Sequence, residues 1–462
     1  KRVLRERTGR APRQAWTPRR HVAIQTRDDL AGLVPGLART LGRDLDVMSL
    51  NDRLCPVAFD DGSAGIFVLA DYCHDDQTLA VLDLLEARGW KLNDPSLFIL
   101  PPALLLAVDR LRPGDPAGGM YRLAFEEGLS VDIAGGGELQ LALAAGVDPA
   151  KLHFHGNAKT DAELVMALDA GVDTIIVDNE DELDRLERLL TRPQNLLLRV
   201  IPGVEAHTHA SQATGGNDSK FGLPMDQAVQ AIERMRAHPL MNFEGVHLHI
   251  GSQILEVEQF AEAVTKIASA GEFGTYDVGG GLGVKYTYTD EAPSVESYLD
   301  AIVAAAKAHL PEGVRIMIEP GRSIVARAGV SVYRVTTVKR TGHVFVAVDG
   351  GLADQMDAAL TGQRFEAVLG NRVLEPWDET VQLVGRQCES GDLLIDRAPL
   401  PAARVGDIAV VATTGAYGYT LANNYDGALK PAVVFVGNGE SRLVVRRETY
   451  AELLATHAPS MP

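Results

Sequence analysis

The sequence predicts a two-domain α/β protein in which repeated βα units around a parallel sheet precede a mainly β domain. The chain of 462 residues is too long for one typical domain, and its hydrophobic content of 46% is ample for two cores. From about residue 120 to 325, short apolar runs alternate with helical patterns, which is typical of βα units. After about residue 326 the pattern changes to β-branched runs separated by turns, which indicates the β domain.

The first region contains seven candidate strands, one fewer than an eight-stranded barrel requires. They are Leu129–Ala134, Lys151–His155, Thr174–Val177, Leu196–Ile201, Phe243–Ile250, Gly274–Val278 and Val314–Ile318. Between them, Gly137–Ala145 and Asp161–Ala170 are rich in Ala and Leu, and Glu180–Leu190 begins with acidic residues that suit a helix N-terminus. This alternation predicts a parallel sheet whose connections are helical.

The second region is predicted to hold five strands and a terminal helix. The strands are Val330–Thr337, His343–Val348, Val381–Val384, Ile408–Ala412 and Ala432–Val436, and the helix is Glu448–Leu454. Residues 21–110 have a mixed pattern, with strands at Ala64–Leu69 and Ser96–Leu100 and helices at Thr78–Arg88 and Pro102–Leu111. We therefore expect a basic arm at 1–20, an N-terminal region at 21–110 that partly joins the β domain, a barrel domain at 111–325 and a β domain at 326–462.

Composition excludes several classes of protein. A formal net charge of −18 argues against a nucleic-acid partner, because the phosphate backbone repels an acidic surface. No stretch approaches the roughly 20 apolar residues of a membrane span, and residues 1–20 lack the apolar core of a signal peptide. We therefore expect a cytoplasmic location. Three scattered cysteines, Cys55, Cys73 and Cys388, form no close pairs, so we expect reduced thiols and no metal site.

Three motifs at the ends of predicted barrel strands are candidates for chemistry. Gly279-Gly280-Gly281 follows a strand, where bare backbone N–H groups suit a phosphate, although tight structural turning explains such a loop equally well. Glu319 and Arg322 flank a sharp turn at the next strand end. His247 and His249 alternate along one strand and so point the same way, which also fits a satisfied pair in the core.

Two further motifs lie in the β domain. Cys388 and Glu389 place a thiol beside a carboxylate, and a glycine-containing loop at 414–419 carries the phenols of Tyr417 and Tyr419. A buried cysteine or a turn tyrosine would be ordinary alone. Their occurrence together with the three barrel motifs favours a functional interpretation.

The order of these motifs, with His155-Gly156-Asn157 preceding them, resembles the diaminopimelate decarboxylase-like family of pyridoxal-phosphate decarboxylases. The resemblance covers roughly residues 120–456. It implies a (β/α)8 TIM-type barrel, a mainly β C-terminal domain completed by N-terminal residues, and a homodimer in which the partner subunit completes each active site. It also implies pyridoxal 5'-phosphate as cofactor and a small amino acid as substrate.

The resemblance assigns roles to individual residues. Glu319 would pair with the pyridine nitrogen, and His249 would stack on the ring. Cofactor contacts are implied for Asp132, His249, Ser252, Gly279, Gly280, Gly281, Glu319, Gly321, Arg322 and Tyr417. Cys388, from the other subunit, would protonate the carbon that loses carbon dioxide, and Glu389 would orient the substrate amine. Implied substrate contacts are Arg322, Glu389, Tyr417 and Asp357.

One departure from the family pattern concerns the lysine that holds the cofactor as a Schiff base on the first barrel strand. Arg112 is followed after a short Pro/Gly segment by Met120, so neither that strand nor its lysine is found, and Lys159 and Lys220 belong to other family motifs. One explanation is that the natural chain has further residues between about Arg112 and Met120. The other is an inactive homologue with a regulatory or scaffolding role, in which Ser96–Leu100 could replace the barrel strand.

A second departure concerns the substrate. The family carries an arginine and a tyrosine that hold the distal carboxylate, and here Asp357 and Thr361 take their places. A carboxylate there would repel a distal carboxylate and suit a distal amine or a neutral tail. We therefore expect an amino-acid decarboxylase, a carbon–carbon lyase that converts meso-diaminopimelate to L-lysine and carbon dioxide or acts on a related amino acid. An inactive homologue is the alternative, and an amino-acid racemase is a more distant one.

Overall fold

The computed structural model describes residues 54–58, 64–69, 97–100, 119–126, 128–203, 219–373, 375–437 and 440–457. The chain divides into two compact units. One unit, called here the barrel unit, consists of Arg112–Lys285 and Asp290–Ile324. The other, called the β unit, consists of Lys1–Leu111, Tyr286–Thr289 and Val325–Pro462. Each unit is described by itself.

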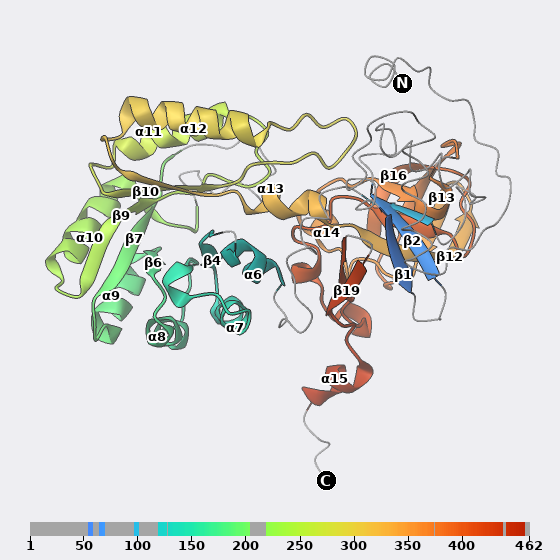
Figure 1. Ribbon diagram of the computed structural model, residues 1–462, viewed down its shortest axis with the longest axis horizontal. Coiled ribbons are helices and arrows are strands. Elements are labelled where there is room, and N and C mark those ends of the chain that lie inside the picture. The colour runs from blue at the N-terminus through green and yellow to red at the C-terminus, as the bar shows by residue number, and fades with distance from the viewer. Residues whose placement is uncertain are drawn as a thin grey trace, which may run out of the picture. The chain divides into compact units, whose positions relative to one another are not determined.

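The barrel unit is built on a parallel sheet with the strand order β11-β10-β9-β7-β6-β5-β4 (Figure 1). These strands are β4 (Val131–Ile133), β5 (Leu152–Phe154), β6 (Thr174–Val177), β7 (Gln194–Ile201), β9 (Met241–His247), β10 (Thr275–Gly280) and β11 (Arg315–Glu319), and the short β8 (Leu223–Pro224) pairs with β7. All seven predicted strands are therefore confirmed. Every residue of β6 is buried, as expected for a strand covered on both faces of a parallel sheet.

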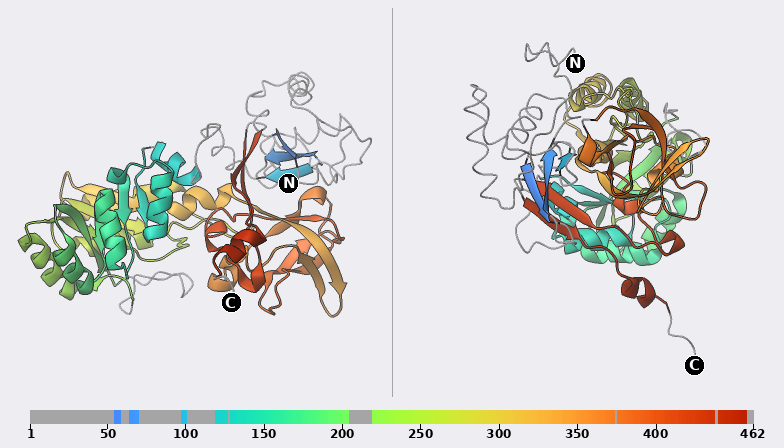
Figure 2. Two further views of the ribbon diagram at one scale, coloured as in Figure 1. Left: turned by 90° about the horizontal axis from the view of Figure 1, so that it is seen from below. Right: turned by 90° about the vertical axis from the view of Figure 1, so that its right-hand side faces the viewer.

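Helices connect the strands of the barrel unit (Figures 1 and 2). They are α6 (Gly119–Glu126), α7 (Gly136–Ala144), α8 (Asp161–Ala170), α9 (Glu180–Leu189), α10 (Met225–Ala237), α11 (Glu258–Ala268), α12 (Val295–His309) and the short α13 (Gly321–Val325), with a 3-10 turn at Pro149–Lys151. The three predicted helices are confirmed. Side-chain caps explain where two of them begin, because Thr160 forms a capping box with Glu163 and Asn179 accepts from the Glu182 amide.

The sheet curls into a nearly closed barrel of seven strands. His155, just after β5, lies 3.3 Å from Glu319 at the end of β11, although β6, β7, β9 and β10 separate these strands in the sheet. Within the described residues, no strand pairs with the outer edge of β4 or of β11. Consistent with this, Arg315 and Ile316 of β11 are exposed, whereas the central strands are buried.

The hypothesis that Ser96–Leu100 replaces a barrel strand is wrong. This segment forms β3 (Leu97–Leu100), which pairs in parallel with β2 (Ala64–Leu69), and β2 pairs with β1 (Leu54–Ala58) in a separate three-stranded sheet. Four apolar residues in a row favour a strand but do not specify its partner. The strand predictions for residues 64–69 and 96–100 are confirmed, whereas the predicted helices at 78–88 and 102–111 and the arm at 1–20 lie outside the described residues.

The β unit contains a six-stranded sheet with the order β14-β17-β12-β13-β15-β16. Its strands are β12 (Ser331–Arg340), β13 (Val344–Val348), β14 (Ala367–Leu369), β15 (Glu379–Val384), β16 (Leu393–Leu400) and β17 (Ile408–Val411), and β18 (Val433–Gly437) pairs with β19 (Glu440–Val445). Strand β1 contacts β18 and β19, so residues of the N-terminal region do join the β fold. The five predicted strands are confirmed, and β14, β16 and β19 were not predicted.

Short helices complete the β unit. They are α14 (Asp357–Thr361), α15 (Tyr450–Ala455) and 3-10 turns at Ala326–Ala328, Gly370–Arg372, Tyr419–Leu421 and Tyr425–Gly427. The predicted terminal helix is α15, which begins after a capping box formed by Thr449 and Glu452. Among the described residues we find no helix with the length and hydrophobicity that a membrane span requires.

Candidate active site

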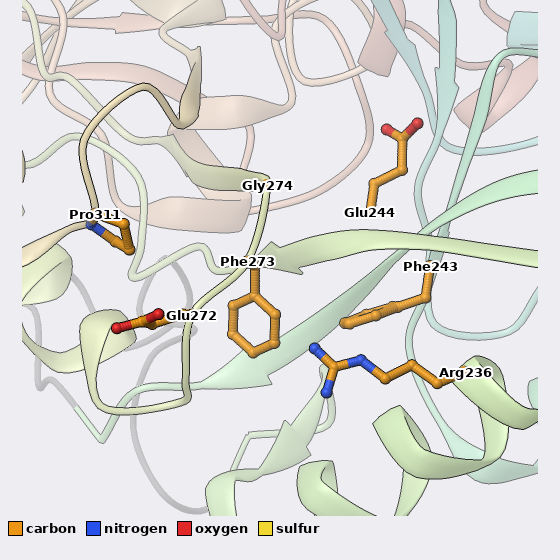
Figure 3. A pocket seen from close by; sticks show the side chains of 7 residues that line it. All are labelled: Arg236, Phe243, Glu244, Glu272, Phe273, Gly274 and Pro311. Atoms are coloured by element: carbon orange, nitrogen blue, oxygen red, sulfur yellow. The ribbon is translucent and has the colours of Figure 1, made fainter.

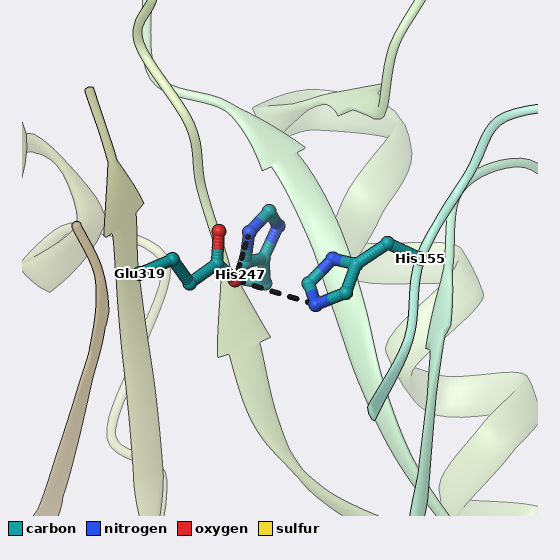
Figure 4. Close-up of side chains that lie close together, drawn as sticks. All are labelled: His155, His247 and Glu319. Atoms are coloured by element: carbon teal, nitrogen blue, oxygen red, sulfur yellow. Dashed lines mark ion pairs between the residues drawn. The ribbon is translucent and has the colours of Figure 1, made fainter. Parts of the chain in front are cut away.

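Three ionisable side chains meet at the carboxyl ends of the barrel strands (Figure 4). The Nε2 atoms of His155 and His247 lie 3.3 Å and 3.1 Å from the same oxygen, Oε1 of Glu319. The two imidazole rings face each other edge to face, with centroids 5.1 Å apart. His249 approaches the other oxygen of Glu319, with Nδ1 3.9 Å from Oε2. The sheet thus joins residues from the ends of β5, β9 and β11 in one cluster.

Burial shifts the pKa values of this cluster strongly. Burial first, and then the charge of Asp132, raises the pKa of Glu319 to about 7 against the opposing effect of His155. The carboxylates of Glu319 and Asp132 outweigh burial and raise the pKa of His155 to about 9. Burial, followed by the cation of Arg199, lowers the pKa of His249 to about 3. At neutral pH His249 is therefore an uncharged ring and His155 carries a proton.

Asp132 lies on β4 at the edge of this cluster. Its Oδ1 is 3.4 Å from Nε2 of His155 and 3.7 Å from Nδ1 of His153. Burial would raise the pKa of Asp132, but the close polar contact with His155 and the charge of His155 outweigh it and lower the pKa. Asp132 is therefore an anion that belongs to the same charge network as Glu319.

The glycine loop packs against backbone so closely that larger residues are excluded. A Cβ on Gly279, which has φ +67°, would lie 2.2 Å from the Leu248 carbonyl oxygen, and one on Gly280 would lie 2.0 Å from that of Glu319. Gly281 has φ +110°, and a Cβ on it would lie 2.2 Å from the Gly251 carbonyl oxygen. The amides of Gly279 and Gly280 donate to Asp277 Oδ1 and His249 Nδ1. The expectation of bare N–H groups is therefore wrong for these two residues, because Asp277 on the same strand and His249 after β9 provide acceptors.

Two of the predicted phosphate contacts lie together. Nη2 of Arg322, at the start of α13, donates to Oγ of Ser252 at 3.1 Å, although 70 residues separate them in the chain. The Arg322 side chain is buried in spite of its length and charge. Gly321 beside it has open space where a Cβ would point.

Four predicted site residues belong to the β unit. Cys388 is exposed, and its amide donates to Oδ2 of Asp426 at 2.9 Å. Glu389 Oε1 accepts from the Gly391 amide and the Ser390 hydroxyl, which lower its pKa in that order. Asp357 is buried, and its Oδ1 accepts from Oγ1 of Thr361 at 3.0 Å.

Tyr417 is the fourth of these residues. Its φ of +56° places it in the left-handed region, and its side chain is exposed. A bulky residue in this conformation is uncommon and marks a constrained loop. The roles of Cys388, Glu389, Asp357 and Tyr417 stay predictions.

Sequence reasoning missed Arg199 and Asp277 and gave no role to His155. Arg199 lies near the end of β7, buried, with its guanidinium carbon 4.5 Å from the centre of the Phe221 ring. Asp277 is completely buried in β10, and burial followed by the charge of Glu319 raises its pKa well above the ordinary value. A charged residue inside an otherwise apolar strand was the available signal for both.

A pocket of about 300 Å³ lies at the opposite ends of the strands (Figure 3). It is lined by Arg236, Phe243, Glu244, Glu272, Phe273, Gly274 and Pro311. These residues lie at or before the beginnings of β9, β10 and β11, and the rings of Phe243 and Phe273 pack edge to face there. Since catalytic residues of such barrels occupy the carboxyl ends of the strands, this pocket is separate from the candidate site.

Comparisons with known proteins agree with this arrangement. The family model for the pyridoxal-binding domain of pyridoxal-dependent decarboxylases matches residues 116–326. The chain is 44% identical to the diaminopimelate decarboxylase of Bacillus methanolicus over 349 residues, which cover 71% of this chain and 81% of that protein. For the diaminopimelate decarboxylase of Bacillus subtilis the identity is 43%, with 74% and 82% covered.

Solved structures show the same relationship. Diaminopimelate decarboxylase from Helicobacter pylori, complexed with L-lysine, superposes with a TM-score of 0.68 at 28% identity, covering 73% of this chain and 86% of that one. Lysine/ornithine decarboxylase from Vibrio vulnificus, complexed with putrescine, gives a TM-score of 0.58 at 26% identity, covering 66% and 81%. With the motif order and the cluster around Glu319, these matches show that the chain belongs to the diaminopimelate decarboxylase family of pyridoxal-phosphate-dependent amino-acid decarboxylases.

Proposed function

We propose that the chain removes the α-carboxylate of meso-diaminopimelate, giving L-lysine and carbon dioxide, with pyridoxal phosphate bound at the carboxyl ends of the barrel strands. The observation that carries this proposal is the cluster around Glu319, where a buried carboxylate faces a neutral imidazole, His249. A carboxylate in this position suits the ring nitrogen of the cofactor, and a neutral aromatic ring suits its face.

The residues of the barrel unit fit the ring and the phosphate of the cofactor. Oε1 of Glu319 makes no hydrogen bond to a described residue and so has an acceptor available for a pyridinium N–H. The paired Arg322 and Ser252 provide a guanidinium and a hydroxyl for the phosphate. Gly321 precedes Arg322, Gly281 packs against Gly251 beside Ser252, and Tyr417 is proposed as a further contact. When bound, the cofactor supplies the electron sink for the electron pair left by carbon dioxide.

The residues of the β unit would move the proton and hold the substrate. The thiol of Cys388 would give its proton to the carbon that has lost carbon dioxide, and the carboxylate of Glu389, held ionised by Gly391 and Ser390, would accept a hydrogen bond from the substrate amine. We propose a cytoplasmic homodimer in which Cys388 and Glu389 of one subunit serve the cofactor of the other. The exposure of Cys388 within its own unit supports this proposal.

The described lysines do not explain how the cofactor would be attached as a Schiff base. Lys159 is the only buried lysine in the described part of the chain. Its ammonium group donates to the carbonyls of Gly156 and Ile176 and to Glu182, each at 2.8 Å, so no proton remains for another partner. This observation favours an inactive, regulatory homologue as the second candidate function.

The identity of the substrate depends on which protein side chain contacts its distal end. Asp357 replaces a family arginine, and its carboxylate is engaged with Thr361 inside α14. A substrate with a distal amine or a neutral tail is therefore the competing candidate to diaminopimelate.

The first experiment combines an intact mass, the absorbance of bound cofactor before and after borohydride reduction, and peptide mapping. A mass above 49.6 kDa with cofactor fixed on one lysine peptide would show that the natural chain contains the missing segment. Carbon dioxide release is then measured with diaminopimelate, lysine, ornithine and arginine. Release from diaminopimelate alone supports the main proposal, and release from lysine or ornithine supports the competing substrate class.

A matched variant pair makes this assay specific for the site. Glu319→Gln should lower turnover at saturating cofactor by at least about a hundredfold, because the ring nitrogen loses its anionic partner. His309→Gln, on an exposed residue at the end of α12, should leave turnover unchanged. No release of carbon dioxide from a cofactor-loaded chain with any of the four amino acids would contradict the decarboxylase proposal and favour the inactive homologue.

A further inference from the structure

We propose that His155, His247 and Glu319 bind one divalent transition-metal ion when the cofactor is absent, and that this ion and pyridoxal phosphate exclude each other. The exclusion, but not the metal binding, rests on the proposed function. Two imidazoles and one carboxylate are a common ligand set for Zn²⁺, Fe²⁺, Co²⁺ and Ni²⁺, whereas Mg²⁺ and Ca²⁺ prefer oxygen ligands.

The donor atoms have a spacing that suits a metal ion. Donors bonded to one tetrahedral Zn²⁺ at about 2.0–2.2 Å lie roughly 3.3–3.5 Å from one another. Here the Nε2 atoms of His155 and His247 lie 3.3 Å and 3.1 Å from Oε1 of Glu319. Figure 4 shows the three side chains converging on one point, and their donor atoms all lie within 4.8 Å of one another.

These atoms also lack hydrogen bonds. Among the described residues, no hydrogen-bond partner exists for Nε2 of His155, for either ring nitrogen of His247 or for Oε1 of Glu319. His247 is 1% exposed, so water does not supply the hydrogen bonds that its two ring nitrogens lack. Because burying a polar group without a hydrogen bond is costly, several such groups converging on one point call for a ligand. One cation would satisfy three of these atoms together.

Further charged and ionisable groups lie around the three donors. Asp132 is an anion 3.4 Å from His155, and Asp277 is a further carboxyl group buried beside Glu319. Arg199 is the cation that opposes these groups at the same strand ends. A divalent ion bound here would be attracted by the carboxylates of Asp132 and Glu319, whereas Asp277, whose pKa is raised well above its ordinary value, adds no negative charge.

A simpler explanation is a proton shared by His155 and its two carboxylates, Asp132 and Glu319. That explanation accounts for His155, which lies 3.4 Å from Asp132 and 3.3 Å from Glu319, but it makes no use of His247. The two explanations differ in a measurable way, because only the metal site needs His247. Glu319 is also the proposed partner of the cofactor ring nitrogen, so a bound metal would occupy the same carboxylate.

The test uses the full chain, freed of cofactor by treatment with hydroxylamine and of metal by dialysis against a chelator. Titration with Co²⁺ should give one equivalent with the visible absorption of a four-coordinate site, and Zn²⁺ should displace it. His247→Gln and Glu319→Gln should each weaken Co²⁺ binding by at least about tenfold, whereas His309→Gln should not change it. Circular dichroism and urea midpoints confirm that the variants fold.

The outcomes separate this inference from the proposed function. Absence of saturable Co²⁺ binding, or binding that both site variants retain, would overturn the metal site. Pyridoxal phosphate should bind to the metal-free chain and fail to bind to the Zn²⁺-loaded chain. If both bind together, the exclusion is wrong. If the metal binds as described but the metal-free chain takes up no cofactor, the proposed function fails while the metal site stands.

Discussion

Nζ of Lys159 lies 2.8 Å from Oε1 of Glu182 in the interior of the barrel unit, where both side chains are almost completely buried. Lys159 also donates to the carbonyls of Gly156, after β5, and Ile176, in β6, whereas Glu182 belongs to α9. Burial lowers the pKa of Lys159 and raises that of Glu182, and the mutual attraction opposes both shifts. This ion pair therefore joins three elements, and its role is structural.

Lys159→Met should destabilise the protein by about 3–5 kcal/mol, because it leaves Glu182 buried without its cation. The double variant Lys159→Met/Glu182→Leu should recover most of this loss, since no charge then remains to be solvated. Urea unfolding followed by circular dichroism measures both. A single variant within about 1 kcal/mol of the wild type would contradict the structural role.

Gly280→Ala should separate β10 from β11, because its Cβ would lie 2.0 Å from the Glu319 carbonyl oxygen. We expect a loss of about 2–4 kcal/mol in the free energy of unfolding and weaker cofactor binding. Gly137→Ala is the control, since open space surrounds its Cβ in α7 and Ala favours helix. It should leave stability equal or slightly higher, and equal losses in the two variants would count against the close approach.

Asp426→Ala should disturb the Cys388 loop, because it removes the acceptor of the Cys388 amide. We expect kcat to fall about tenfold with little change in KM, and iodoacetamide to alkylate Cys388 at a different rate, followed by peptide mass spectrometry. Asp426→Asn keeps an acceptor oxygen and should restore both values to within about twofold. If Asn and Ala behave alike, the hydrogen bond does not position Cys388.

Ser390→Ala should shift the acidic limb of the kcat/KM profile to higher pH. Gly391 and Ser390 lower the pKa of Glu389 from its ordinary value of 4.5. Because the pKa of Glu389 is lowered in the folded protein, its carboxylate is ionised at and above its ordinary pKa. It becomes protonated only as pH falls through the lower pKa of the folded protein. Removing one donor should therefore raise the pKa of Glu389 toward its ordinary value. Ser269→Ala, at the end of α11, is the control, and an unchanged limb in Ser390→Ala would show that another group sets it.

Local pattern was sufficient for many elements. The predicted bounds of α8 (Asp161–Ala170) and β6 (Thr174–Val177) equal those observed, since a capping residue and a run of β-branched residues define them within a few positions. The short strand β14 and the pairing of β3 with β2 were not predicted, because strand pairing depends on residues distant in the chain.

The amino-acid order alone indicated the family, the two kinds of unit and the residue types of the site, because motif spacing and periodicity are properties of neighbouring residues. Only the tertiary structure brought His155 of one strand end to Glu319 of another, paired Arg322 with Ser252, and committed Lys159 to Glu182. Those contacts arise when the sheet curls and excludes water, and burial then shifts the pKa values on which the chemistry depends.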